Sequence, residues 1–320
     1  MFIYKKGKKG YIEFSWLFAL IVGAIILFLA FYFIGAKLLI KTYEKTTEEA
    51  QGIDTLLNPF SYFGELKAKS SSAVNLQQKS TINFSCSQQD NQDLGYDSIT
   101  LSVKNKEGLA RNVYDKYIFA EKEIEAKKLQ ALSVPLELPW RISEVLILWD
   151  YDEKYCFMNA PNAVKETLSD ERLNISGIYF ANSNCPENST KVCFATQNSD
   201  CEIKVNINPD GNTGTTFRQN KRIYFAADSL MYASIFSDYN IYNCNIKRLA
   251  SRLKYQIIIY EDKLNALRAR GCNTNMDFAA LKQKVDSIIE SGDVDENMFE
   301  MWQLSQEIKN ANSRADCKLF

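Results

Sequence analysis

Residues 14–36 read FSWLFALIVGAIILFLAFYFIGA, an uncharged apolar segment of 23 residues near the start of a 320-residue chain. As an α-helix this segment would be about 35 Å long, which is enough to cross a hydrocarbon core of about 30 Å. A cleavable secretory signal has a shorter apolar region and a small-residue cleavage site after it, and no such site follows Ala36. We therefore expect a single transmembrane helix, within residues 11–40, that remains in the mature protein.

The charge on either side of this segment predicts its orientation. Residues 1–10 form a basic leader with four lysines, and residues 1–41 together carry a net charge of +5. Positive flanks tend to stay in the cytoplasm, so the chain beyond residue 41 is expected on the outside of the cell membrane. The whole chain has a net charge of −1, which leaves about −6 on that outer part. An acidic balance argues against nucleic acid as a partner.

The leader also resembles a known export signal. Lys8-Lys9-Gly10 before a hydrophobic helix, with Glu13 at its start, is similar to the archaeal class III signal peptide of type IV pilin-like proteins. The resemblance implies cleavage between Gly10 and Tyr11 and a role for Glu13 in pairing with the amino terminus of a neighbouring subunit. After this cleavage Glu13 would be the third mature residue, whereas bacterial-type pilins carry their glutamate at the fifth. This difference from the family pattern argues against filament assembly more than against cleavage. The alternative is an uncut signal anchor with Glu13 at the headgroup level.

Eight cysteines follow the apolar segment, and they favour disulfide bonds in an oxidising compartment over a metal site. The number is even, no C-x-x-C pair occurs, and the chain has no histidine, so the short ligand spacings of a zinc site are missing. The disulfide candidates are Cys86, Cys156, Cys185, Cys193, Cys201, Cys244, Cys272 and Cys317.

Helix lengths exclude one pairing of these cysteines and favour another. If residues 240–270 form one helix, Cys244 and Cys272 lie about 42 Å apart along it and cannot pair. Two shorter helices returning after residue 271 would bring Cys317 back beside Cys272. We therefore expect a Cys272–Cys317 disulfide that holds the carboxyl terminus against the end of the first helix.

The outer part of the chain changes its hydrophobic period at about residue 227. Residues 41–79 are expected to form a stalk and linker, with a charged stretch at 42–51, an apolar group around Pro59 that would pack on the outer domain, and a Ser- and Lys-rich loop at 67–79. Residues 80–226 contain alternating or short apolar runs typical of strands, with one short helix over 161–168. The expected strands are 98–104, 145–149, 155–158, 175–180, 192–196, 203–208 and 223–226.

Residues 227–320 have helical periodicity. Apolar residues from Ile246 to Leu267 recur at steps of three and four, which predicts one long amphipathic helix ending near Gly271. Two further helices are expected, one ending near Gly292 and one containing Met298 and Ile308. The expected fold class is therefore α+β, with one transmembrane helix, a β-rich extracytoplasmic domain and a C-terminal antiparallel helical subdomain stapled by disulfides.

The chain carries few signs of chemistry. Without histidine, a Ser-His-Asp triad or a Cys-His pair is excluded, and no G-x-S-x-G, P-loop or G-x-G-x-x-G motif is present. Residues 206–211, NINPDG, imitate the start of a calcium loop, but Phe217 stands where the bidentate Glu is needed, so a β-hairpin turn is expected instead. We expect no catalytic residues, no metal and no cofactor.

Three N-glycosylation sequons occur, at Asn83, Asn174 and Asn188. They agree with an outside location without establishing it, because a chain this rich in Asn contains about that many by chance.

The outer region also resembles, in blocks such as 155–157, 229–233 and 315–319, an uncharacterised family of archaeal membrane-anchored proteins. That resemblance implies no activity.

Together these features predict a membrane-anchored cell-surface protein of pilin-like export type with a structural or binding role, and no enzyme. Its partners would be the lipid bilayer and either pilin-like subunits or a membrane complex. The alternatives are a membrane-tethered extracytoplasmic hydrolase and an accessory subunit of a membrane complex.

Overall fold

A computed structural model describes residues 18, 20–33, 69–88, 94–103, 106–181, 184–195, 200–272, 276–290 and 294–320. The contacts of the chain divide it into two units, Met1–Lys45 and Thr46–Phe320. The expected processing residues Gly10, Tyr11 and Glu13 lie outside the described residues, as does most of the expected stalk.

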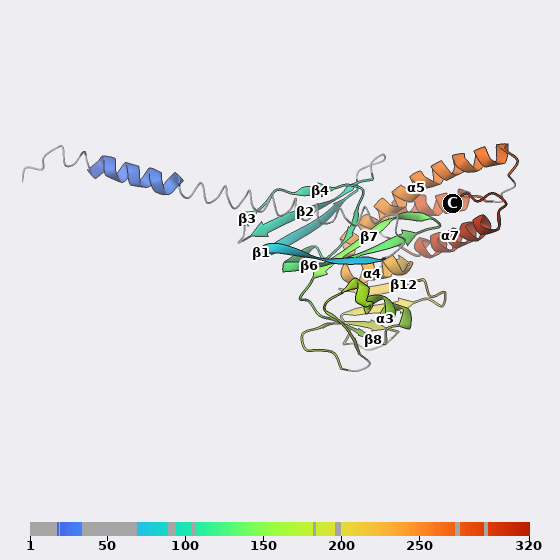
Figure 1. The fold of residues 1–320 in the computed structure, drawn as a ribbon, viewed down its shortest axis with the longest axis horizontal. Helices are drawn as coiled ribbons and strands as arrows, with labels where there is room; N and C mark the ends of the chain where they lie inside the picture. Colours follow the sequence, from blue (N-terminus) through green and yellow to red (C-terminus); the bar gives the residue numbers. More distant parts are fainter. Residues whose placement is uncertain are drawn as a thin grey trace, which may run out of the picture. The chain divides into compact units, whose positions relative to one another are not determined.

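In the first unit, residues 20–33 form a helix, drawn in blue in Figure 1. Its large apolar side chains are exposed on every side of the helix, from Leu20 to Phe33. The ends of the expected 11–40 helix fall outside the described residues. Within the part of the chain that the structure describes, no helix is both long and apolar enough to cross a membrane.

The second unit begins with an antiparallel sheet that carries one parallel edge pair, here called sheet A. Its described strands run in the order β3-β2-β1-β6-β7-β5, and β4 also pairs with β2. They are β1 (Ser70–Ser87), β2 (Tyr96–Val103), β3 (Lys106–Glu107), β4 (Arg111–Val113), β5 (Tyr117–Phe119), β6 (Glu123–Glu137) and β7 (Arg141–Asp150). The strands expected at 98–104 and 145–149 are confirmed as parts of β2 and β7.

Strand β7 shows why a continuous apolar run predicts a doubly buried strand. Val145, Ile147 and Trp149 belong to the larger of the two hydrophobic clusters. Leu146 and Leu148, which point to the opposite face, belong to the smaller one. Because successive side chains of a strand alternate between faces, β7 lies between both clusters.

The expected linker over residues 41–79 is wrong from residue 70 onward, since β1 begins at Ser70. Val74 and Leu76 are buried at alternate positions there, but serines and glutamines around them hide the pattern. The partner strand β6, which we did not expect, supplies the hydrogen bonds, with Ser70 paired to Ser133 and Asn75 to Lys128. Pairing with a distant strand therefore overrides the local loop composition.

A second sheet, sheet B, is mixed. Its described strands run in the order β13-β12-β11-β10-β8-β9, parallel from β9 to β11 and antiparallel from β11 to β13. They are β8 (Tyr155–Met158), β9 (Ile178–Ala181), β10 (Thr190–Phe194), β11 (Ile203–Ile207), β12 (Thr213–Arg218) and β13 (Lys221–Ala226). Helix α3 (Asn162–Leu168) and the 3-10 helix η2 (Glu171–Leu173) lie between β8 and β9. The short helix and the strands expected at 155–158, 192–196, 203–208 and 223–226 are confirmed in their described residues, whereas the strand expected at 175–180 begins only at Ile178.

The hairpin expected at residues 206–211 is also confirmed, because β11 and β12 pair in antiparallel register. Gly211 has a φ of +73°, a conformation that glycine adopts without strain. Asp210 accepts hydrogen bonds from the backbone N–H of Asn212 at 3.1 Å and of Thr213 at 3.0 Å, and from the Thr213 hydroxyl at 2.8 Å. The Asp210 carboxylate, which would be a calcium ligand in such a loop, thus stabilises the turn instead.

Four helices complete the second unit: α4 (Asp228–Phe236), α5 (Tyr239–Ala269), α6 (Ala279–Glu290) and α7 (Asn297–Arg314). The three expected helices correspond to α5, α6 and α7. Helix α5 packs on sheet A, α6 on α5, and α7 on α6 and on β12 and β13 of sheet B.

The sequence did not mark α4 as a separate helix. It lies between the sheets, in contact with β6 and β7 on one side and β12 and β13 on the other (Figure 1). Every residue from Ser229 to Phe236 is buried. A helix that is buried all round has no polar face, so the periodicity that marks a surface helix is missing.

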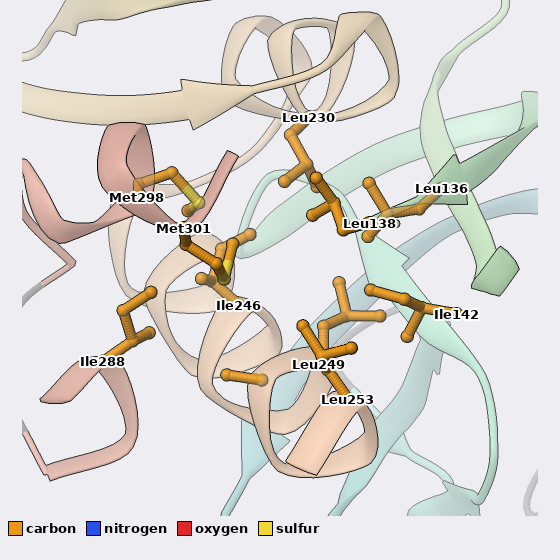
Figure 2. A pocket seen from close by; sticks show the side chains of 11 residues that line it. Leu136, Leu138, Ile142, Leu230, Ile246, Leu249, Leu253, Ile288, Met298 and Met301 are labelled. Carbon is orange, nitrogen blue, oxygen red and sulfur yellow. The ribbon is translucent and has the colours of Figure 1, made fainter. Parts of the chain in front are cut away.

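The helical core packs tightly around α5. Figure 2 shows Leu136, Leu230, Leu249, Leu253 and Met301 converging from β6, α4, α5 and α7 on one apolar gap. The gap has a volume of about 10 Å³, which is at the lower limit for holding one water molecule. It is a small packing defect with no polar lining.

Truncating a side chain at this gap tests the packing. Leu253 is 0% exposed, so Leu253→Ala should lower the free energy of unfolding by about 2–5 kcal/mol through lost burial and an enlarged cavity. Ile259, six residues further along α5, is 65% exposed, and Ile259→Ala should change the free energy of unfolding by no more than about 0.5 kcal/mol. Urea unfolding followed by circular dichroism measures both. Equal losses would contradict the described packing of α5.

Candidate functional site

All eight cysteines are paired in four disulfides: Cys86–Cys244, Cys156–Cys185, Cys193–Cys201 and Cys272–Cys317. The Cys272–Cys317 bond is the one expected from the return of the two terminal helices. The longest loop is closed by Cys86–Cys244, with a sequence separation of 158 residues. This bond joins β1 of sheet A to the second turn of α5.

A buried polar cluster lies beside the Cys86–Cys244 bond. Arg248 of α5 is 0% exposed and donates from Nη1 to Oδ2 of Asp97 at 2.7 Å and to Oδ1 of Asn245 at 2.6 Å. Asn245 donates from Nδ2 to Oδ1 of Asp97 at 3.0 Å and to the carbonyl of Ile118 at 2.7 Å. Both oxygens of the Asp97 carboxylate are therefore engaged.

Backbone groups satisfy much of the remaining hydrogen-bonding capacity of Asp97 and Arg248. The backbone N–H of Ile118 donates to Oδ2 of Asp97 at 2.9 Å. Arg248 donates from Nε to the carbonyl of Leu94 at 2.9 Å and from Nη2 to that of Gly95 at 3.2 Å. The Tyr117 ring covers the guanidinium, with its centroid 4.9 Å from Cζ. A buried ion pair keeps its geometry only when such additional partners are present.

Local geometry explains why the disulfide and the cluster coincide. Cys86 and Asp97 are register partners in the β1–β2 pair. Cys244 and Arg248 are four residues apart on α5, and such residues lie on the same face of a helix. One face of α5 is thus joined to one pair of sheet positions by a covalent bond and by an ion pair.

Burial raises the pKa of Asp97 to about 6, from a usual value of 3.8. The Arg248 charge and the hydrogen bonds from Ile118 and Asn245 act in the opposite direction and do not cancel the desolvation.

A second cluster surrounds Lys69, immediately before β1. Lys69 donates from Nζ to the Thr167 hydroxyl at 2.8 Å and lies 5.7 Å from the centroid of the Tyr232 ring. Burial lowers the pKa of Lys69, and the charge of Asp228 opposes that shift. Ser229 follows Asp228 and is 1% exposed. The hydroxyl partner of Lys69 is that of Thr167, and Ser229 is buried, so this cluster does not present the accessible serine that a Ser–Lys hydrolase uses.

A surface hollow opens at the start of α5. It has a volume of about 170 Å³ and is lined by Phe84, Ser85, Cys86, Lys122, Asp238, Asn240 and Ile241. The Asp238 carboxylate accepts from the backbone N–H groups of Asn240 at 2.8 Å and Ile241 at 3.3 Å, so it already caps the helix. The hollow is smaller than the roughly 300–1,000 Å³ of typical ligand pockets.

The three sequons lie in different settings. Asn83 is half-buried within β1, paired to Thr100 of β2 on one side and to Glu123 of β6 on the other. Asn174 and Asn188 are exposed in loops that precede β9 and β10. In the described parts of the chain, no three His, Cys, Asp or Glu side chains are grouped so that they could hold a metal ion.

Sequence reasoning missed the Asp97–Asn245–Arg248 cluster, although a signal was present. Asp97 continues the buried phase of Ile99, Leu101 and Val103 in β2. Arg248 falls among the apolar residues of α5, next to Leu249. A charged residue at a core position of each of two amphipathic elements indicates a buried ion pair.

Comparisons of the chain with family models, with curated proteins and with solved structures gave no match. Function therefore has to be argued from this chain's own residues.

Replacing Arg248 tests the buried pair through its pH dependence. The folded-state pKa of Asp97 lies above the unfolded value, so its contribution to stability is complete below pH 3.8 and is lost as the pH rises through about 6. Arg248→Met removes a charge that lowers this pKa, so the loss should extend to higher pH. At pH 7.5 the variant should be destabilised by about 3–5 kcal/mol, and less at pH 4.5.

The measurement is urea unfolding of the wild type, Arg248→Met and Asp97→Asn at pH 4.5, 6.0 and 7.5. Asp97→Asn serves as the control, because asparagine cannot titrate and this contribution should disappear. Parallel stability curves for wild type and Asp97→Asn would show that Asp97 does not titrate in this range.

Proposed function

We propose that this protein is anchored in the cell membrane by its N-terminal helix and exposes a disulfide-stapled domain on the outside, where it has a structural or binding role. The pairing of all eight cysteines carries the proposal. Disulfides persist in oxidising compartments and are rare in the cytosol, with hyperthermophile proteins as the known exception. A measurement of which side of the membrane the domain occupies therefore tests the proposal directly.

The helix over residues 20–33 supports the same proposal. A helix that is apolar all round needs either a protein core or a bilayer around it, and its side chains from Leu20 to Phe33 are exposed. The described part accounts for about 20 Å of length, and residues 14–36 as a whole would supply about 35 Å. The four leader lysines favour the orientation with the amino terminus inside.

The resemblance to pilin-like export signals supports cleavage between Gly10 and Tyr11, with Glu13 available for contacts between membrane helices. A self-assembling subunit and an accessory subunit of a membrane complex remain the two structural roles. The hydrolase alternative has no comparable support, because Ser229 beside the Lys69 cluster is buried.

Cysteine labelling tests the location. The described cysteines leave no free thiol, so the wild-type protein is the blank. Ala163 is exposed on α3, and the Ala163→Cys variant should react with a membrane-impermeant maleimide on intact cells. Labelling only after permeabilisation would place the domain inside and overturn the proposal. A cytoplasmic protein of the same cells is the control for membrane integrity.

The mature amino terminus tests the export route. Mass spectrometry of protein from the native membrane should find Tyr11 as the first residue. A start at Met1 would contradict processing and leave an uncut anchor, a result independent of the labelling outcome.

A further inference from the structure

Two of the three sequons lie at the same end of neighbouring strands of sheet B. Strands β9 and β10 flank β8 and are parallel to it, with Tyr155 of β8 paired to Ile178 on one side and to Thr190 on the other. Asn174 precedes β9 by four residues, and Asn188 precedes β10 by two. The amino ends of parallel strands lie at the same end of a sheet, so both asparagines lie at that end.

Both asparagines are exposed and have a left-handed backbone conformation. Asn174 closes η2 in the left-handed conformation, with φ 46° and ψ 47°, and Asn188 has a φ of 55°. Both side chains are exposed. Asparagine tolerates this conformation well, which accounts for its presence in the turns. The hydroxyls that complete the two sequons belong to Ser176 and Thr190, which also form hydrogen bonds within the domain, Ser176 with Tyr151 and Thr190 with Oε1 of Glu153 at 3.4 Å.

Asn174 lies just before β9, the strand at one edge of sheet B as described, where a bulky group would have a physical effect. Among the described strands, β9 pairs only with β8 and ends the order of sheet B, and its Tyr179 is 41% exposed. Exposed edge strands invite pairing with other chains, and proteins cover or charge them. A bulky polar group at Asn174 would lie at the start of this edge.

We propose that Asn174 and Asn188 are N-glycosylation acceptors on the outer domain and that Asn83 is not. In the transfer, Nδ2 of the asparagine forms a bond to the anomeric carbon of a lipid-linked oligosaccharide. The bond from that carbon to the phosphate oxygen breaks, the lipid phosphate leaves, and the amide gives up one proton to a base of the transferase. Asn83 is excluded because its strand is hydrogen-bonded on both sides. This inference rests on the proposed outside location.

Peptide mass spectrometry of the full-length protein from its native membrane tests the assignment. We expect a glycan mass on the peptides of Asn174 and Asn188 and none on that of Asn83. Ser176→Ala should remove the first modification and Thr190→Ala the second, with both asparagines left in place. Ser176→Thr and Thr190→Ser keep the sequons and should keep the glycans.

Failure of this inference is distinguishable from failure of the proposed function. Unmodified Asn174 and Asn188, in protein whose Ala163→Cys variant is labelled on intact cells, would overturn the glycosylation alone. Unmodified sites in a domain that is labelled only after permeabilisation would overturn both. Modification of Asn83 to the same extent would contradict the argument from strand pairing.

Discussion

The attachment of α5 to sheet A is the constraint on which the rest of the outer domain depends. The Cys86–Cys244 bond and the Asp97–Arg248 pair hold the first three turns of a 31-residue helix against β1 and β2. Helix α6 packs on α5, and α7 packs on α6 and on strands β12 and β13 of sheet B. A shift of α5 along sheet A would therefore move every later helix relative to sheet B.

The two attachments contribute in different ways. A cross-link that closes a loop of this length removes about 5 kcal/mol of entropy from the unfolded chain in the loop-closure model. A buried ion pair contributes little net stability, because desolvation offsets the attraction, but either partner alone in the core is costly. We infer that the disulfide and the apolar core supply the stability, while the Asp97–Arg248 pair selects one register of α5 on the sheet.

The sequence predicted those elements whose pattern is local. The alternation in β2, the apolar run in β7 and the stripe along α5 each reflect contacts of one element with one layer, and each was confirmed. The start of β1 was missed because its hydrogen-bond partner, β6, lies far away in the chain. Helix α4 was missed because both of its faces are buried between the sheets. The polar cluster was missed because it exists only once Asp97 and Arg248, 151 residues apart, are brought together.

The sizes of the two cavities at α5 and the positions of the buried charges limit where the proposed binding role could be carried out. The gap beside α5 holds about 10 Å³ and the hollow at its start about 170 Å³, and both are below the size of usual small-molecule pockets. The buried charges face each other and the backbone, so they are used in folding. For the proposed binding role, a partner of the described domain would be met at its surface rather than in either of these two cavities. Four disulfides preorganise that surface, since a rigid scaffold loses less conformational entropy when a partner binds.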